Sequence, residues 1–111
     1  MPLYKNGLPP VNKIDPTFEN SWINYGGATA PLKYWRDSMG YVHIVVVVKD
    51  GVTNVAIFTL PVGFRPLYNF HTPCTSNTAF ANVRINSDGT VNMSVGNNAW
   101  LAINITFLPE Q

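Results

Sequence analysis

Residues 79–95 read AFANVRINSDGTVNMSV, and this stretch has the pattern of a β-hairpin. Asp88 and Gly89 form a dipeptide that tolerates the positive φ angles of tight hairpin turns. From Thr90 to Val95 apolar side chains alternate with polar ones, which is typical of a strand with one buried face. The stretch therefore predicts an antiparallel pair of strands, Ala79–Asn86 and Thr90–Val95.

Similar segments extend in both directions, from Ser21 to Phe107. Short apolar runs are separated by turn signals such as Asp50-Gly51, and no segment has a sustained helical period with a cap at each end. Short strands at nearly regular spacing are typical of sandwiches and barrels. We therefore predict an all-β fold, an antiparallel and jelly-roll-like β-sandwich of about eight strands within residues 21–111. The predicted strands are Ser21–Tyr25, Pro31–Arg36, Tyr41–Lys49, Asn54–Leu60, Leu67–His71, Ala79–Asn86, Thr90–Val95 and Trp100–Phe107.

Residues 1–20 differ from the rest and predict a proline-rich N-terminal arm. Prolines at positions 2, 9, 10 and 16 interrupt regular structure. Ile14 and Phe18 are apolar enough to dock on a protein surface. An arm that wraps its own domain or another subunit fits this composition, and so does an arm without fixed structure.

The predicted strand Tyr41–Lys49 has two largely apolar faces instead of one. Val42, Ile44, Val46 and Val48 form one face, while Val45 and Val47 make the other face apolar as well. Two explanations have equal standing. Either the arm covers the second face, or that face lies at an interface between subunits.

Charge is scarce in this chain of 111 residues, whose length favours a single domain. Charged residues make up 12%, and the net charge is +1. The usual charged share is roughly 25%. Scattered Lys and Arg residues offer no binding footprint for nucleic acid or for an anionic membrane surface. Weak electrostatic repulsion between copies also favours self-association.

Cys74 is the single cysteine, so no intramolecular disulfide can form, which favours folding in a reducing cytosol. The first residues lack the basic stretch and apolar run of a signal peptide. The longest apolar run, Ile44–Val48, is too short to span a bilayer.

The acidic residues predict no catalytic pair. Asp50 and Asp88 belong to Asp-Gly turns, and this role in the turn accounts for both aspartates without catalysis. Glu19 and Asp37 remain, and neither has an evident partner for acid–base chemistry. We therefore predict that the protein is not an enzyme.

Histidine and cysteine suggest a metal site only weakly. His71 lies three residues before Cys74, and His43 would be a third ligand. Structural zinc normally has four ligands in closely spaced pairs. No nucleophile motif surrounds Cys74 either. We expect no metal and no cofactor.

The segment Tyr34-Trp35-Arg36-Asp37 is the candidate binding patch. Flat rings flanked by hydrogen-bonding side chains are how β-sandwich modules hold saccharides. Packing in the core or at an interface is the alternative for any single ring.

A seven-residue motif, Leu60-Pro61-Val62-Gly63-Phe64-Arg65-Pro66, follows an apolar segment. The prolines fix φ and the glycine permits a tight reversal at the end of a strand. We interpret the motif as a structural corner, in which the phenylalanine plugs the end of the sandwich and the arginine pairs with a carboxylate or with backbone carbonyls. The residues assigned to the corner are Pro61, Gly63, Phe64, Arg65 and Pro66.

The corner belongs to an ordered set of segments. Residues 36–44 (RDSMGYVHI) precede it, and residues 83–91 (VRINSDGTV) and 100–103 (WLAI) follow it. This order, over about Trp22 to Phe107, resembles the C-terminal head or shoulder domains of siphophage tail fibres, baseplate proteins and receptor-binding proteins.

The resemblance implies a β-sandwich on a phage tail, synthesised in the host cytoplasm and surrounded by other tail proteins. Such domains are often trimeric and recognise cell-wall saccharide or teichoic acid. We therefore expect adhesion to the host surface, through weak contacts multiplied over many copies. A purely structural tail protein without a ligand is the alternative, and a small cell-wall depolymerase is a third hypothesis. A homotrimer and a monomer both fit the sequence.

Overall fold

A computed structural model gives the arrangement of residues 12–26 and 33–109. These residues include no helix long and apolar enough to cross a membrane. The strands are β1 (Ile23–Asn24), β2 (Lys33–Arg36), β3 (Val42–Lys49), β4 (Ala56–Thr59), β5 (Phe70–Ser76), β6 (Ala79–Ile85), β7 (Thr90–Val95) and β8 (Leu101–Phe107).

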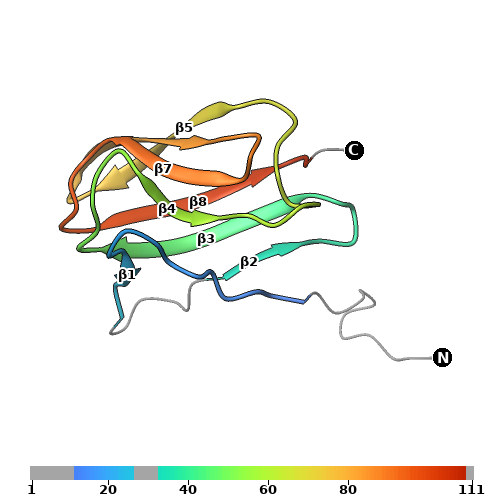
Figure 1. Cartoon of the computed structure of the whole chain (residues 1–111), viewed down its shortest axis with the longest axis horizontal. Helices are drawn as coiled ribbons and strands as arrows, with labels where there is room; N and C mark the ends of the chain where they lie inside the picture. The colour runs from blue at the N-terminus through green and yellow to red at the C-terminus, as the bar shows by residue number, and fades with distance from the viewer. Residues whose placement is uncertain (1–11, 27–32, 110–111) are drawn as a thin grey trace.

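The eight strands form one curled antiparallel sheet in the order β1-β3-β8-β5-β6-β7-β4, with β2 also paired to β3. Strands β1, β2, β3 and β8 make one half, and β5, β6, β7 and β4 make the other (Figure 1). The halves join where β8 pairs with β5, at Leu101 and Ala102, and they face one another across the core. The predicted all-β antiparallel fold of about eight strands is therefore confirmed.

Alternation of side chains builds the core. Strand β3 buries every second residue, and β6 and β7 do the same from the opposite half. Strand β4 has an irregularity between Ala56 and Phe58, so that the adjacent residues Ile57 and Phe58 are both buried. The fully buried side chains with the largest volumes are Phe58, Ile44, Ile57, Leu60, Ile85, Met93, Leu101 and Ile103.

The prediction for the fifth strand was wrong in position. Leu67–His71 was expected, whereas β5 runs from Phe70 to Ser76 and contains Pro73 in its middle. Residues Asn77 and Thr78 form a two-residue turn, with φ angles of 47° and 64°. In an antiparallel pair the backbone N–H and C=O groups of successive residues point alternately toward the partner strand and away from it. Counted back from this turn, the Pro73 nitrogen points away from β6, so the proline removes no hydrogen bond between β5 and β6.

Residues 12–20 of the predicted arm pack against the sheet, while residues 1–11 lie outside the described part of the chain. Ile14 and Tyr34 exchange two backbone hydrogen bonds, of 2.8 and 3.0 Å, at the outer edge of β2. Further along, the Glu19 amide donates to the Ile57 carbonyl of β4 at 2.7 Å. One segment of chain therefore bonds both end strands of the curled sheet.

The second face of β3 is half-buried. Val45 and Val47 are neither buried nor fully exposed, in contrast to the zero exposure of Val46. The described part of the arm pairs beside β2 through Ile14, so its backbone extends the sheet sideways; on this face it contributes the Lys13 side chain, which lies over Trp35 and not over the two valines. Within the described residues, the arm therefore does not cover Val45 and Val47, as the first of the two explanations required.

Candidate functional site

Tyr34 belongs to the core, not to the surface. Its side chain is only 6% exposed, and its ring stacks on Phe58 with centroids 5.9 Å apart. Phe64 meets the same ring edge-on at 5.6 Å. Burial raises the pKa of the Tyr34 hydroxyl. The adjacent Trp35 points the opposite way because successive strand residues face opposite sides of a sheet.

Both faces of the Trp35 ring are occupied. The His43 ring lies parallel to it at 5.0 Å, and the Lys13 ammonium lies 4.7 Å from its centroid. Lys13 comes from the arm on one side of β2 and His43 from β3 on the other, so the two groups contact opposite ring faces. A ligand has no free face of this indole on which to stack.

Asp37 and His43 form a hydrogen-bonded pair beside Trp35. His43 Nε2 lies 2.7 Å from Asp37 Oδ2, and His43 Nδ1 lies 3.0 Å from Thr106 Oγ1. The other oxygen of Asp37 accepts the amides of Met39 and Tyr41, each at 2.9 Å, and so closes the β2–β3 turn. The hydrogen bond from His43 is the main reason why the pKa of Asp37 is lowered.

Arg36 links this turn to the corner. Its Nε donates to the Gly40 carbonyl at 3.3 Å and its Nη1 to the Gly63 carbonyl at 3.2 Å. Each of the four residues of the predicted patch thus contacts another part of the same chain. The structure brings Trp35 and Asp37 together around His43, a partner that the sequence argument did not assign to them.

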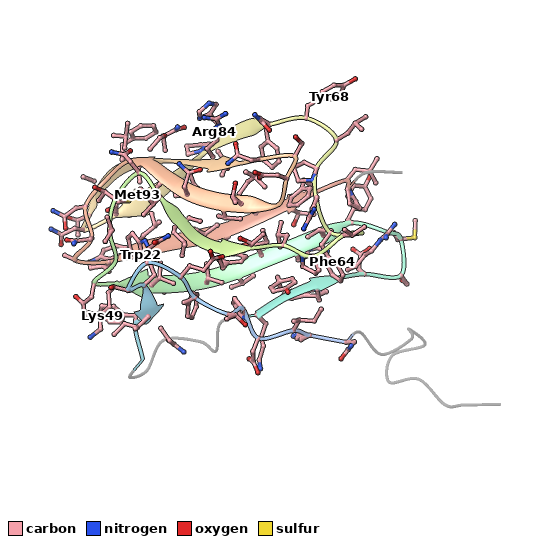
Figure 2. The ribbon with its side chains drawn as sticks, viewed as in Figure 1. Trp22, Lys49, Phe64, Tyr68, Arg84 and Met93 are labelled. Carbon is pink, nitrogen blue, oxygen red and sulfur yellow. The ribbon has the colours of Figure 1, made fainter. Side chains whose placement is uncertain are left out.

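The corner makes a tight reversal after β4. Gly63 has a φ of 94°, and the Phe64 amide donates to the Pro61 carbonyl at 3.1 Å. The Phe64 ring lies against Tyr34 at the edge of the core. Figure 2 shows Phe64 at the end of the molecule where this loop lies.

Arg65 holds the corner against the Asp88-Gly89 turn. Its Nε donates to the Leu60 carbonyl at 2.8 Å, and the Leu60 amide donates to the Gly89 carbonyl at 2.8 Å. Gly89 has a φ of 95°, and a Cβ there would lie 2.4 Å from the Leu60 carbonyl oxygen. Pro66 is buried at the end of the motif.

The suggested metal ligands do not come together. His71 and Cys74 are three positions apart on β5, so they face opposite sides of the sheet. His43 lies on β3, in the other half. The described residues contain no group of three or more His, Cys, Asp and Glu side chains placed to hold a metal ion. Burial raises the pKa of the Cys74 thiol to about 11.

The outward face of β5, β6 and β7 gathers amide and hydroxyl groups that the sequence argument did not single out. We call this surface the amide face. Arg84 projects away from the molecule there (Figure 2). It is the single charged side chain on these three strands. The amide face consists of His71, Phe80, Asn82, Arg84, Asn92 and Ser94.

Hydrogen bonds between neighbouring strands fix the side chains of the amide face. Asn82 Nδ2 lies 2.6 Å from His71 Nδ1 and donates to Ser94 Oγ at 2.5 Å. Asn86 Nδ2 donates to Asn92 Oδ1 at 3.1 Å. Asn82 Oδ1 and Asn92 Nδ2 are left without a partner among the described residues. The face therefore offers at least one fixed acceptor and one fixed donor to solvent.

Phe80 adds an apolar ring to this face. Its side chain is 64% exposed and lies beside Thr75 of β5 in register. No other described ring stacks on it. In contrast to Trp35, Phe80 has ring surface accessible from solvent.

An apolar hollow of about 290 Å³ opens at one end of the molecule. Tyr68, which is 77% exposed, stands at this end (Figure 2). The rings of Phe70 and Phe107 touch inside it, with centroids 5.3 Å apart. Its lining is Pro66, Leu67, Tyr68, Asn69, Phe70, Phe107 and Leu108.

No protein-family model, curated protein or solved structure matches this chain.

Proposed function

We propose that the protein is a non-catalytic adhesion domain of a phage tail that binds cell-wall saccharide of the host through its amide face. The amide face carries this proposal, because it combines an exposed ring with fixed, unpartnered hydrogen-bonding groups. The likeness of the sequence to siphophage tail domains gives the setting, a virion with neighbouring tail proteins.

The chemistry of the amide face suits a polyhydroxylated ligand. A sugar hydroxyl both donates and accepts, and Asn82 Oδ1 and Asn92 Nδ2 present one group of each kind. Arg84 adds further donors. Phe80 supplies apolar surface for the C–H face of a pyranose ring. The antiparallel sheet holds these groups on a broad surface that a polymer can follow.

Fixed side chains reduce the entropy lost on binding. Asn82 is held by His71 and Ser94, so its free oxygen already points in one direction. Contacts of this kind are individually weak. Many copies on one virion multiply them, which makes strong attachment compatible with a shallow surface.

A purely structural tail protein without a ligand is the second candidate. The interactions of Tyr34, Trp35, Arg36 and Asp37 within the chain favour it, because the patch predicted to bind saccharide is engaged in holding the fold. In this alternative the amide face is a hydrated outer surface.

Binding to an array of bacterial cell-wall polysaccharides tests the proposal, with the protein displayed in many copies on beads. We expect the wild type to bind, and Phe80→Ala and Arg84→Ala each to weaken binding by roughly tenfold. Tyr41→Ala removes an exposed aromatic side chain from the β2–β3 turn and is the matched control, which should bind as the wild type does.

Two results would contradict saccharide adhesion. One is the absence of binding by the multivalent wild type, which would favour the structural alternative. The other is equal loss of binding in Tyr41→Ala and Phe80→Ala. Release of reducing ends from cell wall by the purified protein would show instead that it is an enzyme.

A further inference from the structure

The apolar hollow has the lining of a site for an extended, proline-rich segment. The rings of Tyr68, Phe70 and Phe107 line it, and Pro66 and two leucines complete its apolar wall. Grooves lined by aromatic side chains are a common means of binding segments in the polyproline conformation. Tyr68 is 77% exposed, so its ring is accessible to such a segment.

Two polar groups of the lining have no partner among the described residues. Asn69 Oδ1 accepts the amide of Ser87 at 2.7 Å, which holds the side chain and leaves Asn69 Nδ2 free to donate. The hydroxyl of Tyr68 is the second free group. A polyproline segment has no internal hydrogen bonds, so its carbonyl groups are available as acceptors. The hollow therefore combines apolar surface for rings with donors for backbone carbonyls, and its lining contains no charged side chain.

The chain itself contains a segment of matching chemistry. Residues 8–11 read Leu-Pro-Pro-Val, carry no charge and include the single Pro-Pro pair of the sequence. Adjacent prolines favour the polyproline conformation. These residues belong to the predicted arm and directly precede the described part of the chain. An uncharged hollow lined by aromatic rings thus has a candidate occupant in the same sequence.

The arm leaves the described structure at the end of the sheet where the hollow lies. Ile14 pairs antiparallel with Tyr34, so the chain before Ile14 runs toward the Arg36 end of β2. Arg36 is opposite Val42, and Val42 is opposite Phe107, which lines the hollow. The arm and the hollow therefore share one end of the molecule, although the described arm and β5 lie on opposite sides of it (Figure 1).

The two prolines are too close to the described structure to reach the hollow of their own copy. Strands β2, β3 and β8 follow one another beside the arm, so Phe107 lies three strand spacings away, or about 14 Å along the sheet. Pro9 and Pro10 are three and two residues before Asn12. At about 3.1 Å per residue they extend only about 9 and 6 Å from it.

We propose that residues 8–11 of a second copy of this chain occupy the apolar hollow, and that two copies exchange their arms in this way about a two-fold axis. Each copy has its arm and its hollow at the same end, so two copies that meet at these ends can fill each other's hollow. The net charge of +1 keeps the repulsion between them small. This exchange goes beyond saccharide binding, because the amide face contributes nothing to it.

Light scattering after size-exclusion chromatography, over a range of protein concentrations, tests for the dimer. We expect a concentration-dependent dimer that Tyr68→Ala weakens by roughly tenfold or more, because the hollow loses an accessible ring and a hydroxyl donor. Val62→Ala is the matched control. Val62 is also 77% exposed and belongs to the corner, but it does not line the hollow, so this variant should dimerise as the wild type does.

A second pair of variants tests the arm. Replacing Pro9 and Pro10 together with glycine keeps the length of the arm but removes both rings and the preference for an extended conformation. This double variant should also weaken dimerisation by roughly tenfold or more. Pro2→Gly makes the same change outside residues 8–11 and should have no effect. Circular dichroism should show the wild-type fold in each variant, because none of these prolines belongs to the core.

Crosslinking identifies the copy that supplies the arm. Leu67 lines the hollow and is 61% exposed, so p-benzoylphenylalanine can replace it as a photocrosslinker. Isotope-labelled and unlabelled proteins are mixed, irradiated and digested. We expect mass spectrometry to find residues 8–11 joined to the hollow, in peptide pairs with one labelled and one unlabelled member.

A monomer at every concentration would overturn the proposal. So would crosslinks confined to single copies, which would show that the arm occupies its own hollow, and so would a dimer that Tyr68→Ala leaves as tight as the wild type. Phe80→Ala and Arg84→Ala, which test saccharide binding, should leave the dimer intact. Failure of arm exchange and failure of adhesion can therefore be distinguished.

Discussion

The indole of Trp35 and the imidazole of His43 lie parallel, with an interplanar angle of 10° and centroids 5.0 Å apart. They come from directly opposite positions of β2 and β3. Since Asp37 and Thr106 hold the imidazole in its plane, the stack joins three strands of one half of the sheet.

Replacing His43 with alanine should lower the free energy of unfolding by about 2 kcal/mol, from the lost ring contact and hydrogen bonds. His43→Phe keeps the ring contact and removes only the hydrogen bonds, so it should cost about half as much. Urea unfolding followed by tryptophan fluorescence measures both variants. Equal losses would show that the ring contact contributes nothing.

Stability should fall in acid, and Asp37 should contribute to that fall. Its pKa in the folded protein lies below the ordinary value of 3.8, mainly because of its hydrogen bond to His43. A depressed carboxyl pKa adds stability above the ordinary value, and this contribution is lost as the pH falls through and below about 4.

Asp37→Asn keeps an oxygen for the turn amides but cannot ionise. The difference in unfolding free energy between wild type and Asp37→Asn should therefore be present at neutral pH and shrink below pH of about 4. Asp88, whose pKa is also lowered, remains in both proteins and does not affect this comparison. A difference that stays constant down to strongly acidic pH would contradict the assignment.

Gly51 should not tolerate a side chain. A Cβ at this position would lie 2.0 Å from the ring of Trp22, which is 2% exposed. We expect Gly51→Ala to destabilise the protein by about 3 kcal/mol or to prevent folding.

Gly26→Ala is the control for Gly51→Ala, because a Cβ at Gly26 meets nothing within 4 Å. Its φ of 80° still makes alanine unfavourable, by about 1 kcal/mol. Thermal unfolding compares the two variants. Similar melting temperatures would show that Trp22 moves aside easily.

Cys74 should react slowly in the folded protein. With a pKa of about 11, roughly one thiol in a thousand is ionised at pH 8. Alkylation by iodoacetamide at pH 8 should be roughly a hundredfold faster in urea, where the thiol has an ordinary pKa. Equal rates in the folded and unfolded protein would show that Cys74 is not protected by burial.

Local patterns were sufficient to predict most strands, since alternation marks β7 and β8 and Asp-Gly marks the turn between β6 and β7. The position of β5 was not predictable in this way. Pro73 argues against a strand, and it is tolerated only because its nitrogen points away from β6. That depends on the Asn77-Thr78 turn, whose positive φ angles are less evident in sequence than those of Asp-Gly.

The candidate sites depend on pairing, which spacing does not specify. Tyr34 and Trp35 are adjacent in sequence, but a strand places them on opposite faces, so they form no common patch. The amide face joins side chains of three strands, and only the register that places Asn82 near His71 and Ser94 brings them together.

The segment from Ile14 to Glu19 has a consequence for the order of folding. It precedes all eight strands in the chain, yet one of its partners is β4, and β4 pairs with β7. Strand β7 ends at Val95, so this closure cannot form until the chain has been synthesised beyond that residue. We therefore expect the last step of folding to be slow, and its loss to release both ends of the sheet at once.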